Sequence, residues 1–179
     1  MQEVDCSSSG KKIAILGHSY VSRLRFTSPL KVPGFEVRKF GSPRAKVTNI
    51  MERPVWEECI PYRPDYTLLL LGGNDINVNT KPSDLGREIS NLTLKVEELT
   101  GGVCHLINIE SCLQPRDILP DRYKTIRCLG RYVHLKHRVT GMGMETDDLG
   151  QDGVHLSAEG NEKLLQLLLQ QCHDFFGNI

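Results

Sequence analysis

The segment Tyr66-Thr67-Leu68-Leu69-Leu70-Leu71-Gly72-Gly73 places four consecutive leucines directly before two glycines. A strand that is apolar on both faces is typical of the middle of a parallel sheet, where helices cover both sides. The glycines favour a turn after the run. We therefore expect a buried central strand over Tyr66–Leu71 and an α/β fold built around it.

Three further segments are predicted to be strands: Ile13–Leu16, Phe35–Phe40 and Val103–Ile109. The first runs into a short helix that we expect across Val21–Leu24. The second alternates charged with apolar residues, which indicates a position nearer an edge of the sheet.

Four segments carry apolar residues at helical spacing: Ala45–Trp56, Ser83–Leu99, Asp121–His137 and Ser157–Phe176. The first is irregular, and Pro54 interrupts it. In the second the apolar positions from Leu85 to Leu99 step by four and three residues and so share one face. Ser83 and Ser157 are the expected N-caps. Because strands and helices alternate along the chain, we expect a three-layer α/β/α domain with a mostly parallel sheet.

The chain has 179 residues, with 22 basic and 22 acidic side chains and a formal net charge of zero. This length suits one domain, which we place at residues 13–179 after a flexible polar lead-in at 1–12. The balanced charge argues against direct nucleic-acid binding. No signal peptide or membrane span is evident, so we expect a cytoplasmic protein with reduced, unpaired cysteines. The oligomeric state is left open.

Ser19 follows the first predicted strand, in the turn Gly17-His18-Ser19-Tyr20. A serine there often only caps the next helix, but it is a nucleophile if a base lies nearby. Asp152 and His155, three residues apart before the last predicted helix, supply a carboxylate and an imidazole. In a turn, the carboxylate can hold one ring nitrogen while the other faces the serine. Taken alone, Asp-Gly-x-His is also an ordinary turn pattern.

Gly41 and Asn74 follow the second and third predicted strands. Ligands of parallel α/β sheets bind beyond the carboxyl ends of the strands, so these residues should lie near Ser19. A glycine amide and an asparagine side-chain NH₂ can both donate to a developing oxyanion. Each residue is also common in plain turns. With the Ser19 amide, they form the expected oxyanion hole.

Together these blocks resemble the SGNH hydrolase superfamily, also called GDSL-like esterases and lipases. The matching stretches are Ile15–Ser19, Gly41, Leu71–Asp75 and Asp152–Ser157 with Gly160. The resemblance implies a flavodoxin-like sheet, Ser19 as nucleophile, His155 as general base and Asp152 as its support. It implies an oxyanion hole from Ser19, Gly41 and Asn74. It also implies ester substrates, including lipid acyl esters, acetylated sugars and thioesters, and no metal or organic cofactor.

His18 stands where the family usually has aspartate, a residue that braces the turn. The sequence of residues Gly17–Leu24 also resembles that of the esterase domains in first-open-reading-frame proteins of some LINE-type retrotransposons. That resemblance implies a part of a larger chain whose other parts bind nucleic acid and self-associate. Two functions are therefore compared. One is a serine esterase, acting on ester substrates that include lipid at a membrane surface. The other is a catalytically weak binding or assembly module within a retrotransposon ribonucleoprotein.

Other kinds of site fit the sequence less well. The Gly-x-Ser-x-Gly elbow of classical α/β-hydrolases is not matched, because position 21 is valine. A zinc site built from Cys128, His134 and His137 lacks a fourth ligand. Cys112 has no base of its own and is expected only to line the pocket, within a loop over 110–119 that shapes substrate choice.

Overall fold

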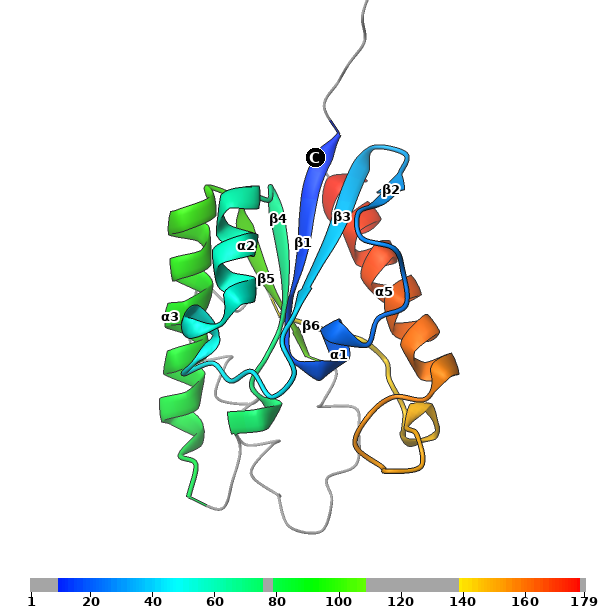
Figure 1. Ribbon diagram of the computed structural model, residues 1–179. Coiled ribbons are helices and arrows are strands. Elements are labelled where there is room, and N and C mark those ends of the chain that lie inside the picture. Colours follow the sequence, from blue (N-terminus) through cyan, green and yellow to red (C-terminus); the bar gives the residue numbers. More distant parts are fainter. Residues whose placement is uncertain (1–9, 76–78, 109–138, 178–179) are drawn as a thin grey trace, which may run out of the picture.

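The computed structural model describes residues 10–75, 79–108 and 139–177. Its six-stranded sheet has the order β2-β3-β1-β4-β5-β6, in which β2 is antiparallel to β3 and the other strands are parallel (Figure 1). The strands are β1 (Lys11–Gly17), β2 (Leu30–Val32), β3 (Phe35–Gly41), β4 (Tyr66–Leu70), β5 (Val103–Asn108) and β6 (Val139–Gly141). The helices are α1 (Ser19–Ser22), α2 (Pro54–Tyr62), α3 (Pro82–Thr100) and α5 (Ala158–Gly177). Short 3-10 turns span Ile50–Glu52, Gly73–Asp75 and Thr146–Asp148.

The two central strands are buried on both faces. In β1, Ile13 and Ile15 belong to one apolar cluster and Ala14 and Leu16 to the other, and all four are fully buried. The leucines of β4 divide between the same two clusters in the same way. Successive side chains of a strand point to opposite faces, so a continuous apolar run is what a strand between two helical layers requires. The expected three-layer α/β/α architecture is confirmed.

One layer of helices covers each face of the sheet. Figure 1 shows α2 and α3 on one side and α5 on the other. The cluster on the α5 side takes in Leu164, Leu168 and Cys172, together with Tyr20 and Val21 of α1. Burying such a helix face is the main source of its stability in a domain of this kind.

The strands and the last helix lie close to where the sequence predicts them, but several helix boundaries differ. The irregular period over Ala45–Trp56 is not one helix, because Pro54 begins α2 as its first residue. In the same way α3 begins at Pro82, so Ser83 lies inside the helix and is not its N-cap. Leu99, expected on the buried face, is 39% exposed. Ser157 does cap α5, because its Oγ accepts a hydrogen bond from the Gly160 amide at 3.0 Å.

Other expectations meet the structure only in part. Lys11 and Lys12, which the sequence places in the lead-in at 1–12, belong to β1. The predicted helix over Asp121–His137, Cys112 and the three residues weighed as zinc ligands lie outside the described residues. Within the described ranges, no helix is long and apolar enough to cross a membrane, and no cluster of three metal-ligating side chains occurs. Cys59, Cys104 and Cys172 are buried, and none of these three forms a disulfide.

Candidate active site

Ser19 lies at the end of the central strand β1, as the first residue of α1. The tight turn is held by His18. The His18 carbonyl accepts hydrogen bonds from the amides of Val21 and Ser22, and its Nδ1 accepts one from the Tyr20 amide at 3.3 Å. His18 is only 5% exposed and serves as the N-cap of α1. His18 thus braces the turn at the position where the resembled family usually has an aspartate, since both side chains can accept a hydrogen bond at the start of a helix.

The described part of the chain contains no hydrogen-bond partner for the Ser19 amide. The next three amides of α1 are taken by His18. An amide at a helix start carries partial positive charge, so it can stabilise an anion that lies next to it. The Ser19 amide therefore has the chemistry of an oxyanion donor.

Asp152 and His155 form a pair in the loop that leads into α5. The Asp152 Oδ2 lies 2.6 Å from the His155 Nδ1, and its Oδ1 accepts from the amides of Val154 and His155, each at 2.9 Å. The hydrogen bond from the His155 ring, followed by those two amides, holds the pKa of the Asp152 carboxyl well below its usual range. A carboxylate that remains ionised fixes the imidazole with its proton on Nδ1, which leaves Nε2 free to act as a base.

The loop that carries this pair is closed at its base and fastened to α5. The Gly150 amide donates to the His155 carbonyl at 2.7 Å, and the Ser157 amide donates to the Asp148 carbonyl at 2.8 Å. Lys163 of α5 forms an ion pair with Asp148 at 2.7 Å. A Cβ on Gly160 would lie 2.1 Å from the Asp148 carbonyl oxygen, so glycine is needed where α5 begins. The pair therefore stands on a rigid support.

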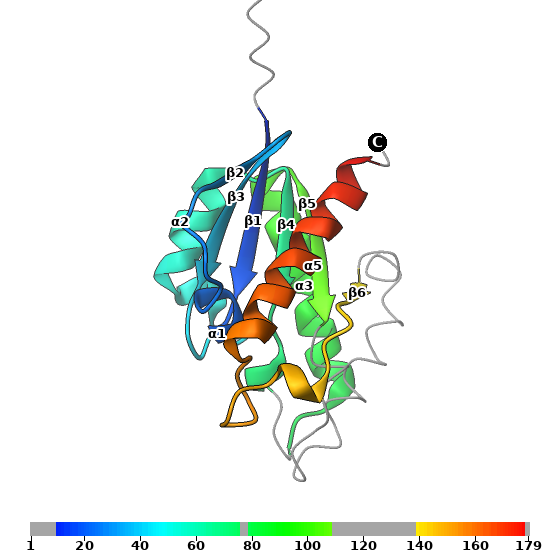
Figure 2. The same cartoon turned by 90° about the vertical axis from the view of Figure 1, so that its right-hand side faces the viewer.

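Tyr20 joins the two halves of the site. Its hydroxyl donates to the Val154 carbonyl at 2.6 Å, and its ring meets the His155 ring edge-on, with centroids 6.5 Å apart. Figure 2 shows α1 beside the loop that precedes α5. The fold thus brings the turn that carries Ser19 next to the loop that carries His155, although the two segments lie far apart in the sequence. The sequence carries no signal for this role of Tyr20 other than its position beside the serine.

Asn74 and Asp75 link the loops that follow β3 and β4. The Asn74 Nδ2 donates to the Ala45 carbonyl at 3.0 Å, and the Asp75 Oδ2 accepts from the Val47 amide at 3.0 Å. Burial raises the pKa of Asp75, although the Val47 and Thr48 amides oppose the shift. Asn74 is exposed at the carboxyl edge of the sheet, and its NH₂ group has a second hydrogen that can reach a ligand.

Gly41 has a packing role that the sequence does not indicate. A Cβ there would lie 2.2 Å from the Ser22 amide nitrogen, so only glycine lets α1 pack this closely on β3. The Ser42 amide donates to the Gly17 carbonyl of β1 at 2.9 Å. Because successive strand amides point to opposite sides and the Ser42 amide points to β1, the Gly41 amide points away from that strand. Its expected part in the oxyanion hole stays a prediction.

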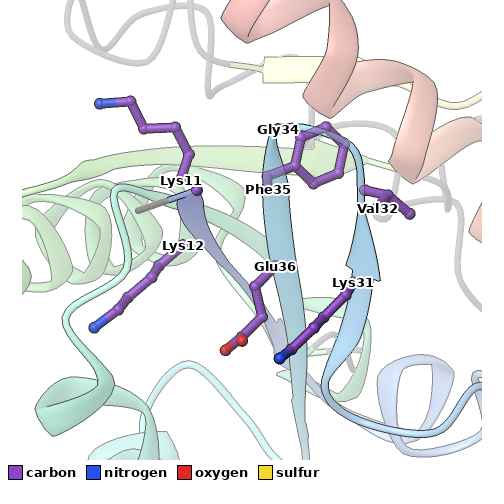
Figure 3. Close-up of a pocket in the computed structure, with 8 residues that line it drawn as sticks. Lys11, Lys12, Lys31, Val32, Gly34, Phe35 and Glu36 are labelled. Atoms are coloured by element: carbon purple, nitrogen blue, oxygen red, sulfur yellow. The ribbon is translucent and has the colours of Figure 1, made fainter. Parts of the chain in front are cut away.

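A surface pocket of about 600 Å³ lies at the other end of the sheet. It is lined by the first residues of β1 and β3, whereas Ser19 and Gly41 stand at or just beyond the last residues of the same strands. Figure 3 shows that Lys11 points away from Lys12 and Lys31, so the three ammonium groups do not converge on one point. This pocket is separate from the candidate active site.

No protein-family model and no curated protein matches the sequence, but solved structures match the fold. The esterase EstA from Pseudoalteromonas has a TM-score of 0.70 at 12% identity, covering 93% of this chain and 99% of that one. A carbohydrate esterase of family 3 from Talaromyces cellulolyticus has a TM-score of 0.67 at 12% identity, covering 94% and 99%. A protein of the G-D-S-L family from Desulfitobacterium hafniense has a TM-score of 0.66 at 13% identity, and the match covers 89% of this chain and 98% of that one. The chain therefore has the mostly parallel α/β/α fold of these three structures.

Proposed function

We propose that this protein is a serine esterase that hydrolyses carboxylic esters through an acyl-serine intermediate. The observation that carries the proposal is the short hydrogen bond between Asp152 and His155, in a loop that Tyr20 connects directly to the Ser19 turn. The esterases among the structural neighbours support the same reaction class.

In the proposed reaction, His155 Nε2 takes the proton of the Ser19 hydroxyl as the oxygen attacks the ester carbonyl carbon. Negative charge collects on the carbonyl oxygen, where the Ser19 amide and the Asn74 NH₂ donate hydrogen bonds. Collapse of the tetrahedral intermediate breaks the bond to the alcohol oxygen, which leaves with the proton from His155. Water then attacks the acyl-serine by the same route and releases the carboxylic acid. Asp152 stays ionised throughout and stabilises the imidazolium.

The neighbours act on more than one kind of ester, so the alcohol part of the substrate is open to direct testing. One is a carbohydrate esterase and another belongs to a lipolytic family. A panel of acetyl and longer-chain aryl esters, acetylated sugars and lipid vesicles would separate a sugar deacetylase from a lipase. We further propose an intracellular location, because the three described cysteines are buried and form no disulfide.

The experiment that tests the activity uses a fluorophosphonate probe on the whole chain, with the adduct mapped by peptide mass. We expect the label on Ser19, and we expect Ser19→Ala to lose both the label and ester turnover. Ser22→Ala, in the same short helix, is the matched control and should keep both. A folded wild-type protein that neither takes the label nor hydrolyses any ester of the panel would rule the enzyme out.

That negative result would favour the alternative of a binding or assembly module. The alternative is motivated by the replacement of aspartate by His18 and by a second sequence block that consists of Gly41 alone. His18, however, caps α1 and keeps the turn intact. The finer resemblance to retrotransposon esterase domains has no support in the structural comparisons. We therefore propose no binding partner on the basis of that resemblance.

A further inference from the structure

Tyr20 occupies a position from which one side chain reaches both halves of the active site. It is the second residue of α1, directly after Ser19, and it is only 6% exposed. Its amide donates to the His18 Nδ1, so its backbone is fixed by the same residue that caps the helix. Its ring lies in the apolar cluster beneath α5. The side chain is therefore anchored before it makes any contact with the loop.

The contact with the loop falls on one particular peptide group. The carbonyl of Val154 and the amide of His155 belong to the same peptide plane. Tyr20 donates to that carbonyl at 2.6 Å, and Asp152 accepts from that amide at 2.9 Å. Two hydrogen bonds at opposite ends of one planar group fix its rotation about the chain axis. They consequently fix the direction in which the His155 side chain leaves the backbone.

We propose that Tyr20 is a positioning residue of the esterase, which sets the orientation of His155 relative to Ser19 by holding the Val154–His155 peptide. The inference rests on the proposed function. Its hydroxyl acts on the carbonyl side of the peptide and Asp152 on the amide side, while the edge-on ring contact limits tilting of the imidazole. Tyr20 itself contacts none of the reacting atoms in this assignment.

The variant that tests this is Tyr20→Phe, which removes only the hydroxyl and keeps the buried ring. Small displacements of catalytic groups reduce the rate strongly, so we expect kcat to fall about tenfold to hundredfold. KM should stay within about twofold, because the proposed role concerns the base and not substrate binding. Fluorophosphonate labelling of Ser19 should slow by the same factor as kcat.

Tyr62→Phe is the matched control. The Tyr62 side chain is half-buried, and its hydroxyl, like that of Tyr20, donates a hydrogen bond, here to the Glu36 Oε1 at 3.2 Å. Tyr62 and Glu36 lie toward the other end of the sheet, near the pocket of Figure 3. We expect Tyr62→Phe to keep wild-type kcat and labelling. An equal loss in both variants would mean that a general loss of stability, and not positioning, explains the Tyr20 result.

A double-mutant cycle tests whether Tyr20 acts through His155. In the Asp152→Asn background the imidazole has already lost its correct tautomer. Tyr20→Phe should therefore lower kcat by less there than in the wild type. Fully independent, multiplying effects would overturn the assignment, because they would show that Tyr20 does not act on the group that Asp152 holds.

Amide hydrogen exchange provides a measurement that does not depend on activity. The peptide covering 150–157 should exchange at least about tenfold faster in Tyr20→Phe than in the wild type, and Tyr62→Phe should leave it unchanged. If the wild type is inactive but shows this exchange difference, the proposed function is refuted, while the hold of Tyr20 on the Val154–His155 peptide stands. If the wild type is active and Tyr20→Phe changes neither kcat nor the exchange rate, only the positioning role of Tyr20 is refuted.

Discussion

Replacing Asp152 by asparagine separates catalysis from folding in this protein. The Asp152 carboxylate accepts three hydrogen bonds, two at Oδ1 from backbone amides and one at Oδ2 from the His155 ring. In Asp152→Asn the amide oxygen can keep both backbone bonds, but an NH₂ group now faces the His155 Nδ1. The imidazole must then accept a hydrogen bond at Nδ1 and carry its proton on Nε2, where it cannot take the serine proton.

We expect this change to lower kcat by about 10⁴-fold, the usual cost of the wrong tautomer in such a triad. The side chain of Asp152 is 52% exposed, so the midpoint of thermal unfolding should move by no more than about 2 °C. Asp147→Asn is the control, because Asp147 is an exposed residue of the same loop and should keep full activity. Steady-state hydrolysis of an aryl ester and a thermal scan give the two measurements. A kcat within tenfold of the wild type would refute the triad.

The pH profile of the same pair gives an independent check. Because its hydrogen bonds depress the pKa of Asp152, this carboxylate stays ionised as the pH falls from neutral. Protonation of Asp152 should therefore contribute nothing to any loss of kcat/KM between neutral pH and about pH 5, which lies above the ordinary aspartate pKa. A loss of kcat/KM over that range that Asp152→Asn abolishes would contradict this electrostatic account.

Three further changes follow from the packing. Gly160→Ala forces a Cβ against the Asp148 carbonyl, so it should lower the free energy of unfolding by about 1–3 kcal/mol and also reduce activity. Gly177→Ala is the control, because the added Cβ meets nothing, and it should change neither quantity. Equal melting temperatures of the two variants would disprove the clash. His18→Asp should keep the cap of α1, whereas His18→Ala should lower the free energy of unfolding, measured by chemical denaturation, by about 1 kcal/mol. An alanine variant as stable as the wild type would show that the cap is dispensable. Burial raises the pKa of Cys59 and Cys172 to about 12, so both thiols should resist alkylation at pH 8 until the protein unfolds. Peptide mapping after alkylation measures this, and modification of the folded protein would contradict their burial.

The parts of the fold that could be predicted are those in which local sequence and tertiary environment agree. The four leucines before Gly72 suit only a strand covered on both faces, and β4 is such a strand. Pro54 misled the prediction because proline interrupts a helix in its interior but is favoured at its first turn. The edge strands β2 and β6 are three residues long, too short to produce a recognisable period.

The candidate site was predictable as a set of residues but not as an arrangement. The side chains of Ser19, Asp152 and His155 are typical of a nucleophile, a carboxylate support and a base. The alternation of strands and helices predicts that they lie at the same edge of the sheet. Tyr20 could not be found in this way, because its contact with Val154 is a hydrogen bond to a backbone carbonyl. Any residue offers such a carbonyl, so the sequence holds no trace of the pairing. The orientation of the Gly41 amide likewise depends on strand register, which one sequence does not specify.

The short edge strands have a consequence for solubility. A strand on the rim of a sheet offers unpaired amides and carbonyls to which another polypeptide can add, and this is a common start of amyloid-like aggregation. Here β2 spans only Leu30–Val32 between Pro29 and Pro33, with the exposed Lys31 at its centre, and β6 spans only Val139–Gly141. Proline cannot donate to an incoming strand, and a buried lysine charge would oppose its docking. Concentrated preparations should therefore resist fibril growth from the β2 rim.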